Sequence, residues 1–460
     1  MTNERRLFLP IEVKTRELSA KLALALRAVD RGWTVYLGWS GAIQSLAAHS
    51  YSGVYLEKNL HPARANLFDR LRRAGHALLA LEEEGLAVLN YDWYVTKNIR
   101  FDMLERIDRF LSWGDMEAEA ICRRHPTLAE RVVITGNPRA DLMRPEYSQV
   151  ILQEGAGYRQ KYGRYVLVVS SFSRVNLING TLDDFARNIS KRVSLGPEET
   201  AFLRQSLDHT NAIFQAFKNL IPGLATAFPD TPIVVRPHPA ENQKTWSQYA
   251  SNFNNVHVIP DGTATGWIAG ATAMIHNGCT TAIEGTLLGT VPIAYRPVVS
   301  DRFDVPLPNE LSEQALSLES AIELTDKRLK GYGPELSPDH QALLKRAVAC
   351  TDGRSACDRI LDCAEDVHPT STGRDSLGKF YLENIENRIL QTINTGLLTA
   401  KSAVKIALGK ADGFPSNYSQ QKFPGLSKQD IDTLIESFPA TMRPRLRITR
   451  LAPHCFRLSA

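Results

Sequence analysis

The chain has 460 residues, of which 43% are hydrophobic and 23% are charged, and its formal net charge is +4 at pH 7. This length suits two domains rather than one hydrophobic core, and the composition excludes a disordered or fibrous protein. The positive charge is too small to argue for a nucleic-acid binder, although it is compatible with an anionic substrate or an anionic membrane surface.

Two further features bear on the cellular compartment. The N-terminal sequence MTNERRLFLPIEVKTREL has no apolar run of the length that a signal peptide needs. No stretch reaches the roughly 18 consecutive apolar residues that span a bilayer. We therefore expect a cytoplasmic protein, with peripheral contact to the cytoplasmic face of the inner membrane as an open possibility. The six cysteines are scattered, and we expect reduced and mostly buried thiols.

The first third of the chain alternates strand and helix signals. An amphipathic helix is predicted over residues 16–32, where Gly32 ends the pattern. Strands are predicted at 5–12, 33–39, 76–85, 109–114 and 131–136. Such a βαβ series indicates a parallel sheet with helices on both faces. We assign residues 1–150 to an N-terminal domain of this kind.

The same pattern restarts after about residue 145, so the hinge is expected near 145–162. A helix is predicted over 196–224, because Pro197 and acidic residues open it. Further strands are predicted at 165–171, 231–239, 255–260, 272–278 and 290–295. We assign residues 151–365 to a second α/β domain.

Residues 366–460 form a different kind of segment, which we predict to be a helical tail. Apolar residues recur at helical spacing over 379–408, and the segment 443–458 carries five arginines. Two interpretations stay open. The tail either packs across the two domains or presents a basic amphipathic surface to anionic lipid.

Polar residues follow three predicted strands of the second domain, where open parallel sheets bind ligands. In the segment IHNGCTT, Gly278 allows close backbone approach, and a helix that begins near Thr280 points free N–H groups outward. This pattern favours a phosphate site, with Glu284 placed to accept hydrogen bonds from ribose hydroxyls. The alternative is simple helix capping around a buried histidine. The predicted nucleotide-binding residues are Arg236, His238, Pro239, His276, Asn277, Gly278, Thr280, Thr281, Glu284, Ser171 and Ser173.

Three consecutive glutamates, Glu82, Glu83 and Glu84, end a buried strand of the first domain. A carboxylate there can act as a base, or as a nucleophile on a sugar carbon, as in retaining glycosidases. Glu83 is our first choice for the catalytic group. Other polar and aromatic residues at strand ends suit a sugar acceptor or an anionic group of the donor. These candidates are Lys14, Arg16, Glu17, Trp39, Asn137 and Arg174.

Several ordered motifs together resemble one family. These are PIEVKTREL, LEEEGL, FLSWG, ITGNPRADL, VVRPHPAE and IHNGCTTAIEGTLLGTVPIAY, with QKFPGLS in the tail. The chain is similar to the bacterial surface carbohydrate biosynthesis proteins, which more distantly resemble retaining transferases of CMP-activated Kdo and nonulosonic acids. The resemblance implies a GT-B fold, with two Rossmann-like domains that face each other across a cleft. It also implies that His238 and Pro239 contact the CMP phosphate and that Arg174, Lys14 or Arg16 binds the donor carboxylate.

The leading hypothesis is therefore a metal-independent GT-B glycosyltransferase that uses no cofactor. It would transfer a CMP-activated ulosonic acid, with retention, to a glycan or glycolipid acceptor of the bacterial surface, such as lipopolysaccharide or capsule. The nucleotide-sugar donor would bind the second domain and the acceptor the first. The alternatives are a UDP-sugar 2-epimerase, a CDP-glycerol-type phosphotransferase and a non-catalytic, nucleotide-binding assembly subunit.

Overall fold

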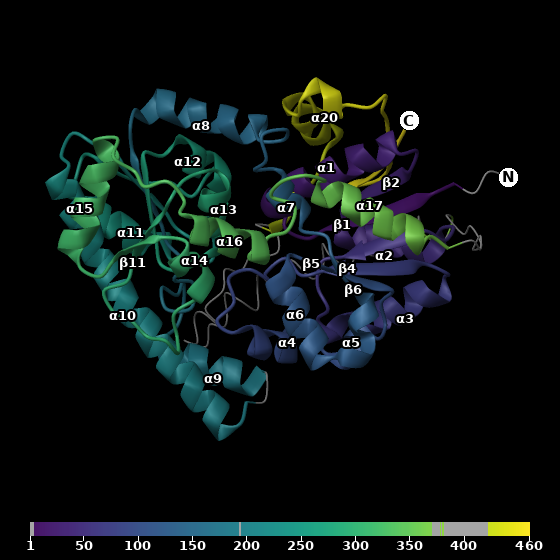
Figure 1. Ribbon diagram of the computed structural model, residues 1–460, viewed down its shortest axis with the longest axis horizontal. Coiled ribbons are helices and arrows are strands. Elements are labelled where there is room, and N and C mark those ends of the chain that lie inside the picture. The colour runs from purple at the N-terminus through teal and green to yellow at the C-terminus, as the bar shows by residue number, and fades with distance from the viewer. Residues whose placement is uncertain (1–3, 193–194, 370–377, 379, 381–421) are drawn as a thin grey trace. The chain divides into compact units, whose positions relative to one another are not determined.

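The computed structural model describes residues 4–192, 195–369, 378, 380 and 422–460. By its internal contacts the chain divides into two units, each with its own sheet (Figure 1). Unit 1 holds the described residues of 1–150, 341–393 and 419–460, and unit 2 holds those of 151–340.

Unit 1 is built on an eight-stranded sheet in the order β13-β14-β2-β1-β3-β4-β5-β6. Strands β1 to β6 are parallel, whereas β14 runs antiparallel to β2 and to β13. The elements are β1 (Arg6–Ile11), α1 (Lys14–Asp30), β2 (Thr34–Trp39), α2 (Ser40–His49), β3 (Val54–Glu57), η1 (Pro62–Arg64), α3 (Ala65–Arg73), β4 (Ala77–Leu81), α4 (Tyr91–Asn98), α5 (Phe101–Leu104), β5 (Arg109–Ser112), α6 (Asp115–Arg124), η2 (Pro126–Arg131), β6 (Val132–Ile134), α7 (Pro138–Asp141), α17 (Ala356–Asp366), α20 (Lys428–Ser437), η3 (Ala440–Met442), β13 (Arg447–Ala452) and β14 (Cys455–Ser459).

Helices cover both faces of this sheet. Along β1, Leu7 and Leu9 pack into one core with α1, α17 and α20, and Phe8 packs into the other with α2 to α6 (Figure 1). Successive side chains of a strand point to opposite faces, so a strand buried on both faces is apolar throughout. This explains why β1, β2 and β4 are near-continuous apolar runs.

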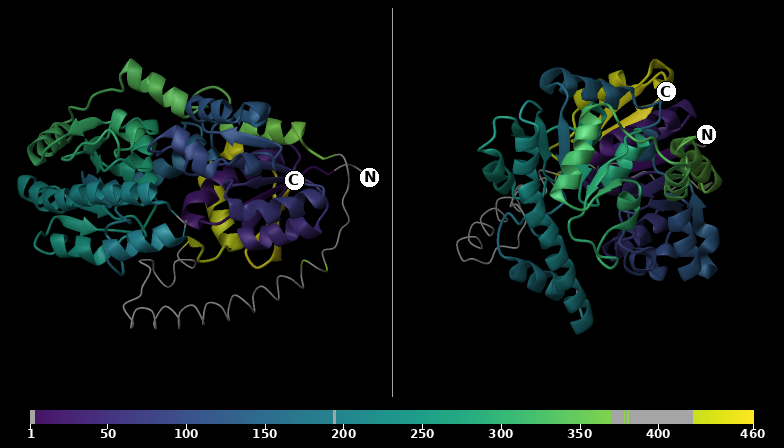
Figure 2. Two further views of the ribbon diagram at one scale, coloured as in Figure 1. Left: turned by 90° about the horizontal axis from the view of Figure 1, so that it is seen from below. Right: turned by 60° about the vertical axis from the view of Figure 1, so that its left-hand side comes forward.

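The C-terminal segment corrects the prediction of a helical tail. Helix α20 is present, but residues 447–459 form two strands that extend the sheet beyond β2. Figure 2 shows these yellow strands beside the purple N-terminal ones. In β14, Phe456 and Leu458 are buried and Arg457 between them is exposed. This period of two is that of a strand. The predicted helix at 379–408 lies outside the described residues, except for Phe380.

Unit 2 contains a six-stranded parallel sheet in the order β12-β11-β10-β7-β8-β9. The elements are α8 (Gln149–Tyr162), β7 (Val166–Val169), α9 (Leu182–Arg192), α10 (Pro197–Ala227), β8 (Ile233–Arg236), α11 (Gln243–Ala250), β9 (Val256–Val258), α12 (Ala264–Gly270), β10 (Ala273–His276), α13 (Thr280–Leu287), β11 (Ile293–Tyr295), α14 (Pro306–Glu310), β12 (Glu313–Ala315), α15 (Leu318–Leu329) and α16 (Pro338–Ala347), of which α8 and α16 extend across the unit boundaries.

The strand order of unit 2 is that of a Rossmann fold. The chain first adds β8 and β9 on one side of β7, and then adds β10, β11 and β12 on the other. The order reverses between β7 and β10, and ligands of such sheets bind at this switch point, beyond the carboxyl ends of the strands. Unit 1 has its own switch point between β1 and β3, because β2 lies on the opposite side of β1.

These sheets confirm the predicted α/β class with two Rossmann-like units. The contact-based division differs from the predicted domain limit at 365, because α17 packs on α1 and α7 and therefore belongs to unit 1. The six cysteines are unpaired and mostly buried, as predicted. No helix among the described residues is long and apolar enough to cross a membrane.

Candidate functional site

The carboxyl edge of the unit 1 sheet brings together most of the residues predicted there. Trp39 ends β2, and the segment with Lys14, Arg16 and Glu17 follows β1. The three glutamates follow β4, and Asn137 follows β6. Because the strands are parallel, these ends share one edge of the sheet.

Glu17 stabilises the turn between β1 and α1. Its carboxylate accepts the backbone N–H groups of Glu12 and Val13 at 3.1 and 2.9 Å, and it pairs with Lys21 Nζ at 2.8 Å. Burial alone would raise the pKa of Glu17, but Lys21 and Lys58 lower it to about 2. Glu17 is therefore a permanently charged support of this turn.

The two predicted cations of this turn have carboxylate partners within unit 1. Lys14 lies 3.0 Å from Asp430 of α20, and Arg16 is bonded to Glu84. Burial alone would lower the pKa of Arg16, but Glu84 and Glu83 raise it above its ordinary value. A substrate carboxylate would have to compete with these internal partners.

The three glutamates after β4 have different surroundings. Glu84 is exposed, and its pKa is lowered by Arg16 against the effect of burial. Glu83 is buried, and its Oε2 lies 3.5 Å from Arg139 Nη1. Glu82 is also buried, and burial together with the nearby Glu117 raises its pKa to about 8. At neutral pH the run thus combines the Glu84 carboxylate with the Glu82 carboxylic acid, the division of roles that acid–base chemistry needs.

Four strand ends of this edge carry a buried polar atom without a hydrogen-bond partner among the described residues. These atoms are Arg16 Nε, Glu57 Oε2, Glu83 Oε2 and Asn137 Nδ2. Buried polar groups are nearly always satisfied in native proteins, so each of these atoms marks a place where a further partner, such as an ordered water, is expected. The two carboxylate oxygens have an arginine nearby, since Glu83 Oε2 lies 3.5 Å from Arg139 and Glu57 Oε2 lies 3.9 Å from Arg64.

In unit 2, the carboxylate of Glu241 organises the ends of β7 and β8. It accepts hydrogen bonds from five groups at 2.9–3.2 Å, and only 1% of the residue is exposed. The donors are Ser170 Oγ, the Phe172 and His238 backbone N–H groups, Asn176 Nδ2 and Trp246 Nε1. Sequence analysis did not assign Glu241 a role, although it lies two residues after the His-Pro pair.

At the switch point, Asn277 connects β10 to β7. Its side chain accepts the Ser171 N–H at 3.0 Å and donates to the Ser171 carbonyl at 3.3 Å. His276 accepts the Gly278 N–H through Nδ1 and bonds Ser312 through Nε2. It is fully buried, and burial lowers its pKa to about 3, so His276 is a neutral structural residue. The carboxyl ends of β7 and β10 thus lie side by side, as predicted, and His276 is buried beneath them.

Helix α13 begins directly after this turn. Gly278 has φ of +81°, a backbone conformation that favours glycine. The N-cap residue is Cys279, whose Sγ lies 2.6 Å from Thr281 Oγ1. A thiol is a weak acceptor, and the Ala282 N–H also bonds the Cys279 carbonyl at 3.1 Å, so what the start of α13 lacks is a side-chain oxygen as its cap. The half-buried Thr280 and Thr281 lie in this turn, and Glu284 is buried one turn further.

The other predicted nucleotide ligands divide into internal and exposed groups. Arg236 donates to the carbonyl groups of Pro260, Asp261 and Gly262, so its guanidinium holds the loop after β9. His238 and Pro239 are exposed at the end of β8, and His238 Nδ1 accepts the Ala240 N–H at 3.1 Å. Ser173 is half-buried, and the exposed Arg174 has no carboxylate partner among the described residues.

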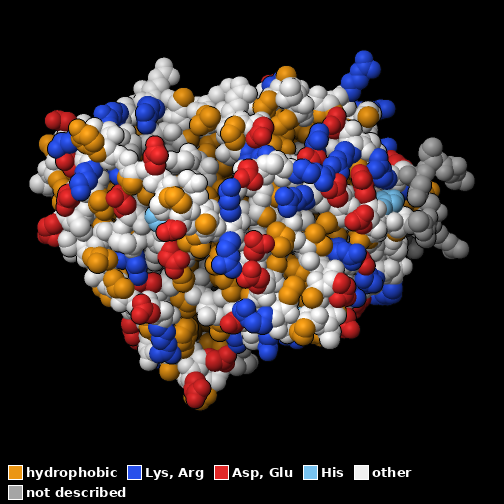
Figure 3. All heavy atoms as spheres, viewed as in Figure 1, with side chains coloured by type: hydrophobic (Ala, Val, Ile, Leu, Met, Phe, Trp, Pro, Cys, Tyr) orange, Lys and Arg blue, Asp and Glu red, His pale blue; other side chains and the backbone are white. Residues whose placement is uncertain are grey.

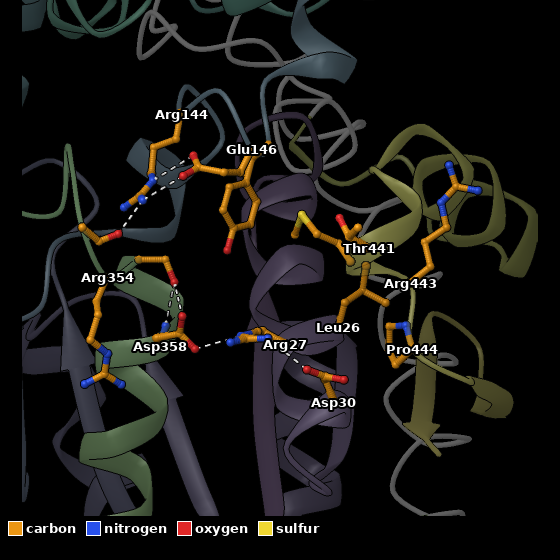
Figure 4. Close-up of a pocket in the computed structure, with 14 residues that line it drawn as sticks. Leu26, Arg27, Asp30, Arg144, Glu146, Arg354, Asp358, Thr441, Arg443 and Pro444 are labelled. Carbon is orange, nitrogen blue, oxygen red and sulfur yellow. Dashed lines mark hydrogen bonds and ion pairs between the residues drawn. The ribbon is translucent and has the colours of Figure 1, made fainter.

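A separate cavity of about 310 Å³ lies elsewhere in unit 1, between α1, α17 and the segment after α20 (Figure 4). Arg27 pairs with Asp30 and Asp358, and Arg144 pairs with Glu146. Arg354 pairs with Asp362, and Arg443 donates to the backbone carbonyls of Phe438 and Glu436, so the arginines of the cavity lining are all engaged within unit 1. The cavity contains none of the residues predicted for the site.

Comparisons with known proteins give similarity of fold at low identity. No protein-family model and no curated protein matches the chain. Among solved structures, a protein from Listeria monocytogenes designated a UDP-N-acetylglucosamine 2-epimerase is 12% identical, with a TM-score of 0.46, over 79% of this chain and 96% of that one. The wall teichoic acid polymerase TagF is 10% identical (TM-score 0.43; 79% and 89% covered). Anabaena HepE, in complex with UDP and glucose, is 12% identical (TM-score 0.43; 79% and 100% covered). Similarity at this level identifies neither an activity nor a substrate.

Proposed function

We propose that the chain is a glycosyltransferase that takes its sugar from a nucleotide donor. The main support for this proposal is the switch point of unit 2. There the exposed His238 follows β8, and α13, which begins with Thr280 and Thr281, follows β10. Helix N-termini with free N–H groups bind phosphate, and a cation nearby offsets its charge. Unit 1 supplies the carboxyl groups for the chemistry and the polar edge for the acceptor.

The donor we propose is a CMP-activated ulosonic acid, transferred with retention to a bacterial surface glycan. Support comes from Arg174, an exposed guanidinium without a carboxylate partner among the described residues, which suits the extra carboxylate of such a sugar. The Glu83 carboxylate would attack the anomeric carbon as the bond to the CMP phosphate breaks. The acceptor hydroxyl would then displace Glu83 from the anomeric carbon, give its proton to the released CMP phosphate and restore the original configuration. No step requires a metal or a cofactor.

Nucleotide-dependent protection from thermal unfolding tests this proposal first. CMP at 100 times its dissociation constant should stabilise the protein by about 2.7 kcal/mol, a shift of several degrees, whereas UDP, UMP and GDP should give less. The variants Thr280→Val and His238→Ala should lose most of the shift, because they remove phosphate donors. Thr286→Val, the same change later in α13, should keep it.

The pattern of nucleotide selectivity separates the alternatives. A UDP-selective shift would favour a UDP-sugar epimerase or transferase, and a CDP-selective shift a CDP-glycerol-type phosphotransferase. No shift with any nucleotide would contradict the phosphate site, and Gly278 to Thr281 would then serve only as a helix start.

Peripheral contact with an anionic membrane is a second proposal, based on the C-terminal hairpin. Residues 440–460 contain no acidic residue, whereas basic and acidic side chains are interspersed over the face of the molecule in Figure 3. Of the five exposed arginines, only Arg457 has a carboxylate partner, Glu4, among the described residues. The other four are Arg443, Arg445, Arg447 and Arg450.

Co-sedimentation with vesicles tests the membrane proposal. The protein should bind vesicles rich in phosphatidylglycerol and release at high salt. Replacing Arg445, Arg447 and Arg450 by glutamine should weaken binding about 100-fold, because each basic residue contributes about 1 kcal/mol near such a surface. A matched triple change on unit 2, at Arg164, Arg187 and Arg204, should have little effect. Equal losses in both triple variants would indicate a general charge effect instead.

A further inference from the structure

Glu117 lies beneath the glutamate run and is not part of the predicted site. It is in the first turn of α6, directly after β5, and is fully buried. Its carboxylate accepts Tyr94 Oη–H at 2.6 Å, the Trp113 N–H at 2.8 Å and Ser112 Oγ–H at 3.1 Å. Tyr94 of α4 and the Trp113 N–H after β5 therefore fix its position, together with Ser112 Oγ, whose proton is shared with the Gly114 carbonyl at 2.8 Å.

The turn that carries the glutamates rests on this group. Trp113 Nε1 donates to the Glu82 carbonyl at 2.6 Å. A Cβ at Gly85 would lie 2.6 Å from Glu117 Oε1, 3.0 Å from Trp113 and 3.1 Å from Tyr94 Oη. Real Cβ contacts are not this short, so only glycine lets the turn pack so closely. This accounts for the glycine that ends LEEEG.

The charges around Glu82 and Glu117 favour retention of protons. Glu83 and Glu84 follow Glu82 in the same turn, and Tyr91 and Tyr94 face Glu117 from α4. Arg16 and Arg139 pair with Glu84 and Glu83. Without a cation, burial raises the pKa of Glu117 to about 7, and burial with the Glu117 charge raises that of Glu82 to about 8.

We propose that Glu117 is a positioning residue, which fixes the turn that carries Glu82 and Glu83 and keeps Glu82 in its carboxylic acid form. Arg139 Nη1 lies 3.5 Å from Glu83 Oε2, and Glu82 in its acid form can donate a hydrogen bond to an oxygen of the sugar. The role of Glu117 in sugar transfer rests on the proposed function. The protonation of Glu82 and Glu117 in the free protein does not depend on that function.

Infrared titration of the free protein tests this without any substrate. The C=O band of a protonated carboxyl group should persist above pH 6 and disappear between about pH 6 and 9, as the two groups titrate as a pair. Glu117→Gln should remove one of the two protons and move the remaining titration down by about one pH unit or more, because the repelling charge is gone. Glu119→Gln, an exposed change on the same helix, should titrate as the parent does.

Further variants keep the test decisive if Glu117→Gln does not fold. Tyr94→Phe removes a donor that stabilises the Glu117 carboxylate, so the titration midpoint of Glu82 and Glu117 should rise.

Because the pKa values of Glu82 and Glu117 are both raised from 4.5 by folding, unit 1 should lose stability as the pH rises from about 5 to 8, and Glu82→Gln should reduce this loss.

Two results would overturn the proposal. One is the absence of a protonated carboxyl group above pH 6, and the other is a Glu117→Gln variant that titrates as the parent does. Failure of the nucleotide shift would instead contradict the proposed function and leave the carboxyl pair intact, so the two failures are distinguishable.

Discussion

A Glu83→Gln variant should retain its nucleotide-induced thermal shift but release CMP from a CMP-sugar donor about a thousand-fold more slowly, or not at all. Loss of a nucleophile or a proton-transferring group typically has an effect of this order or more. Glutamine has the same shape but cannot form the covalent intermediate. We choose Glu83 because Glu84 is exposed and bonded to Arg16, and burial with the nearby Glu117 raises the pKa of Glu82 to about 8, whereas Glu83 is buried with Arg139 at 3.5 Å.

Comparison of the three single variants gives the decisive result. Glu84→Gln should reduce turnover less than Glu83→Gln, since the Glu84 side chain is exposed and paired. Unchanged turnover in Glu82→Gln, Glu83→Gln and Glu84→Gln would contradict a catalytic role for the run. Nucleotide binding without any transfer activity in the parent protein would favour an assembly subunit.

Replacing Glu241 by alanine should destabilise unit 2 by about 4 kcal/mol, a decrease in its unfolding temperature of about 8–16 °C. The change leaves five buried donors without their common acceptor, and each buried unsatisfied group costs about 1–3 kcal/mol before water or neighbouring groups compensate. Differential scanning calorimetry would measure the effect, and the nucleotide-induced shift should fall as well, because the His238 backbone N–H is one of the five donors.

Glu323→Ala is the matched control for this experiment. Glu323 is an exposed glutamate of unit 2 that pairs with Lys327 one helical turn later, and such pairs contribute only about 0.3–0.5 kcal/mol. A loss of under 1 kcal/mol in Glu241→Ala would show that water replaces the carboxylate and that the ends of β7 and β8 are held by other contacts.

The sequence was sufficient for elements with a long apolar signal. Strands β1, β2, β4 and β8 lie within predicted ranges, and helix α10 begins at Pro197, as expected from the acidic first turn. Strands β3 (VYLE) and β12 (EQA) were not predicted; the sequence of β12 is mostly polar and offers no apolar run to detect. The hairpin of β13 and β14 was not predicted, because the arginines and apolar residues of this short segment fit the period of a strand and the period of a helix about equally well.

The candidate site shows a similar limit. Its strand ends were predictable, because parallel sheets gather ligand groups at one edge. The sequence did not show which of these polar residues are exposed and which bond to other parts of the protein. Arg236 and His238 belong to one RPHP motif, yet Arg236 is bonded to loop carbonyls and His238 is exposed. Glu117 follows Gly114 by three residues and Glu241 follows Pro239 by two, and neither position belongs to a recognisable motif. Only the hydrogen bonds that these two carboxylates accept reveal their roles.

The pairing of β14 with β2 has a consequence for the order of folding during synthesis. Strand β2 leaves the ribosome early, but the partner for its outer edge, residues 455–459, is made more than 400 residues later. Unit 2 is contiguous over residues 151–340 and can fold while that edge is still open. An exposed edge strand is a template for unwanted pairing. The nascent chain therefore carries an aggregation-prone edge for most of its synthesis, and chaperone binding near β2 would protect the chain in that interval.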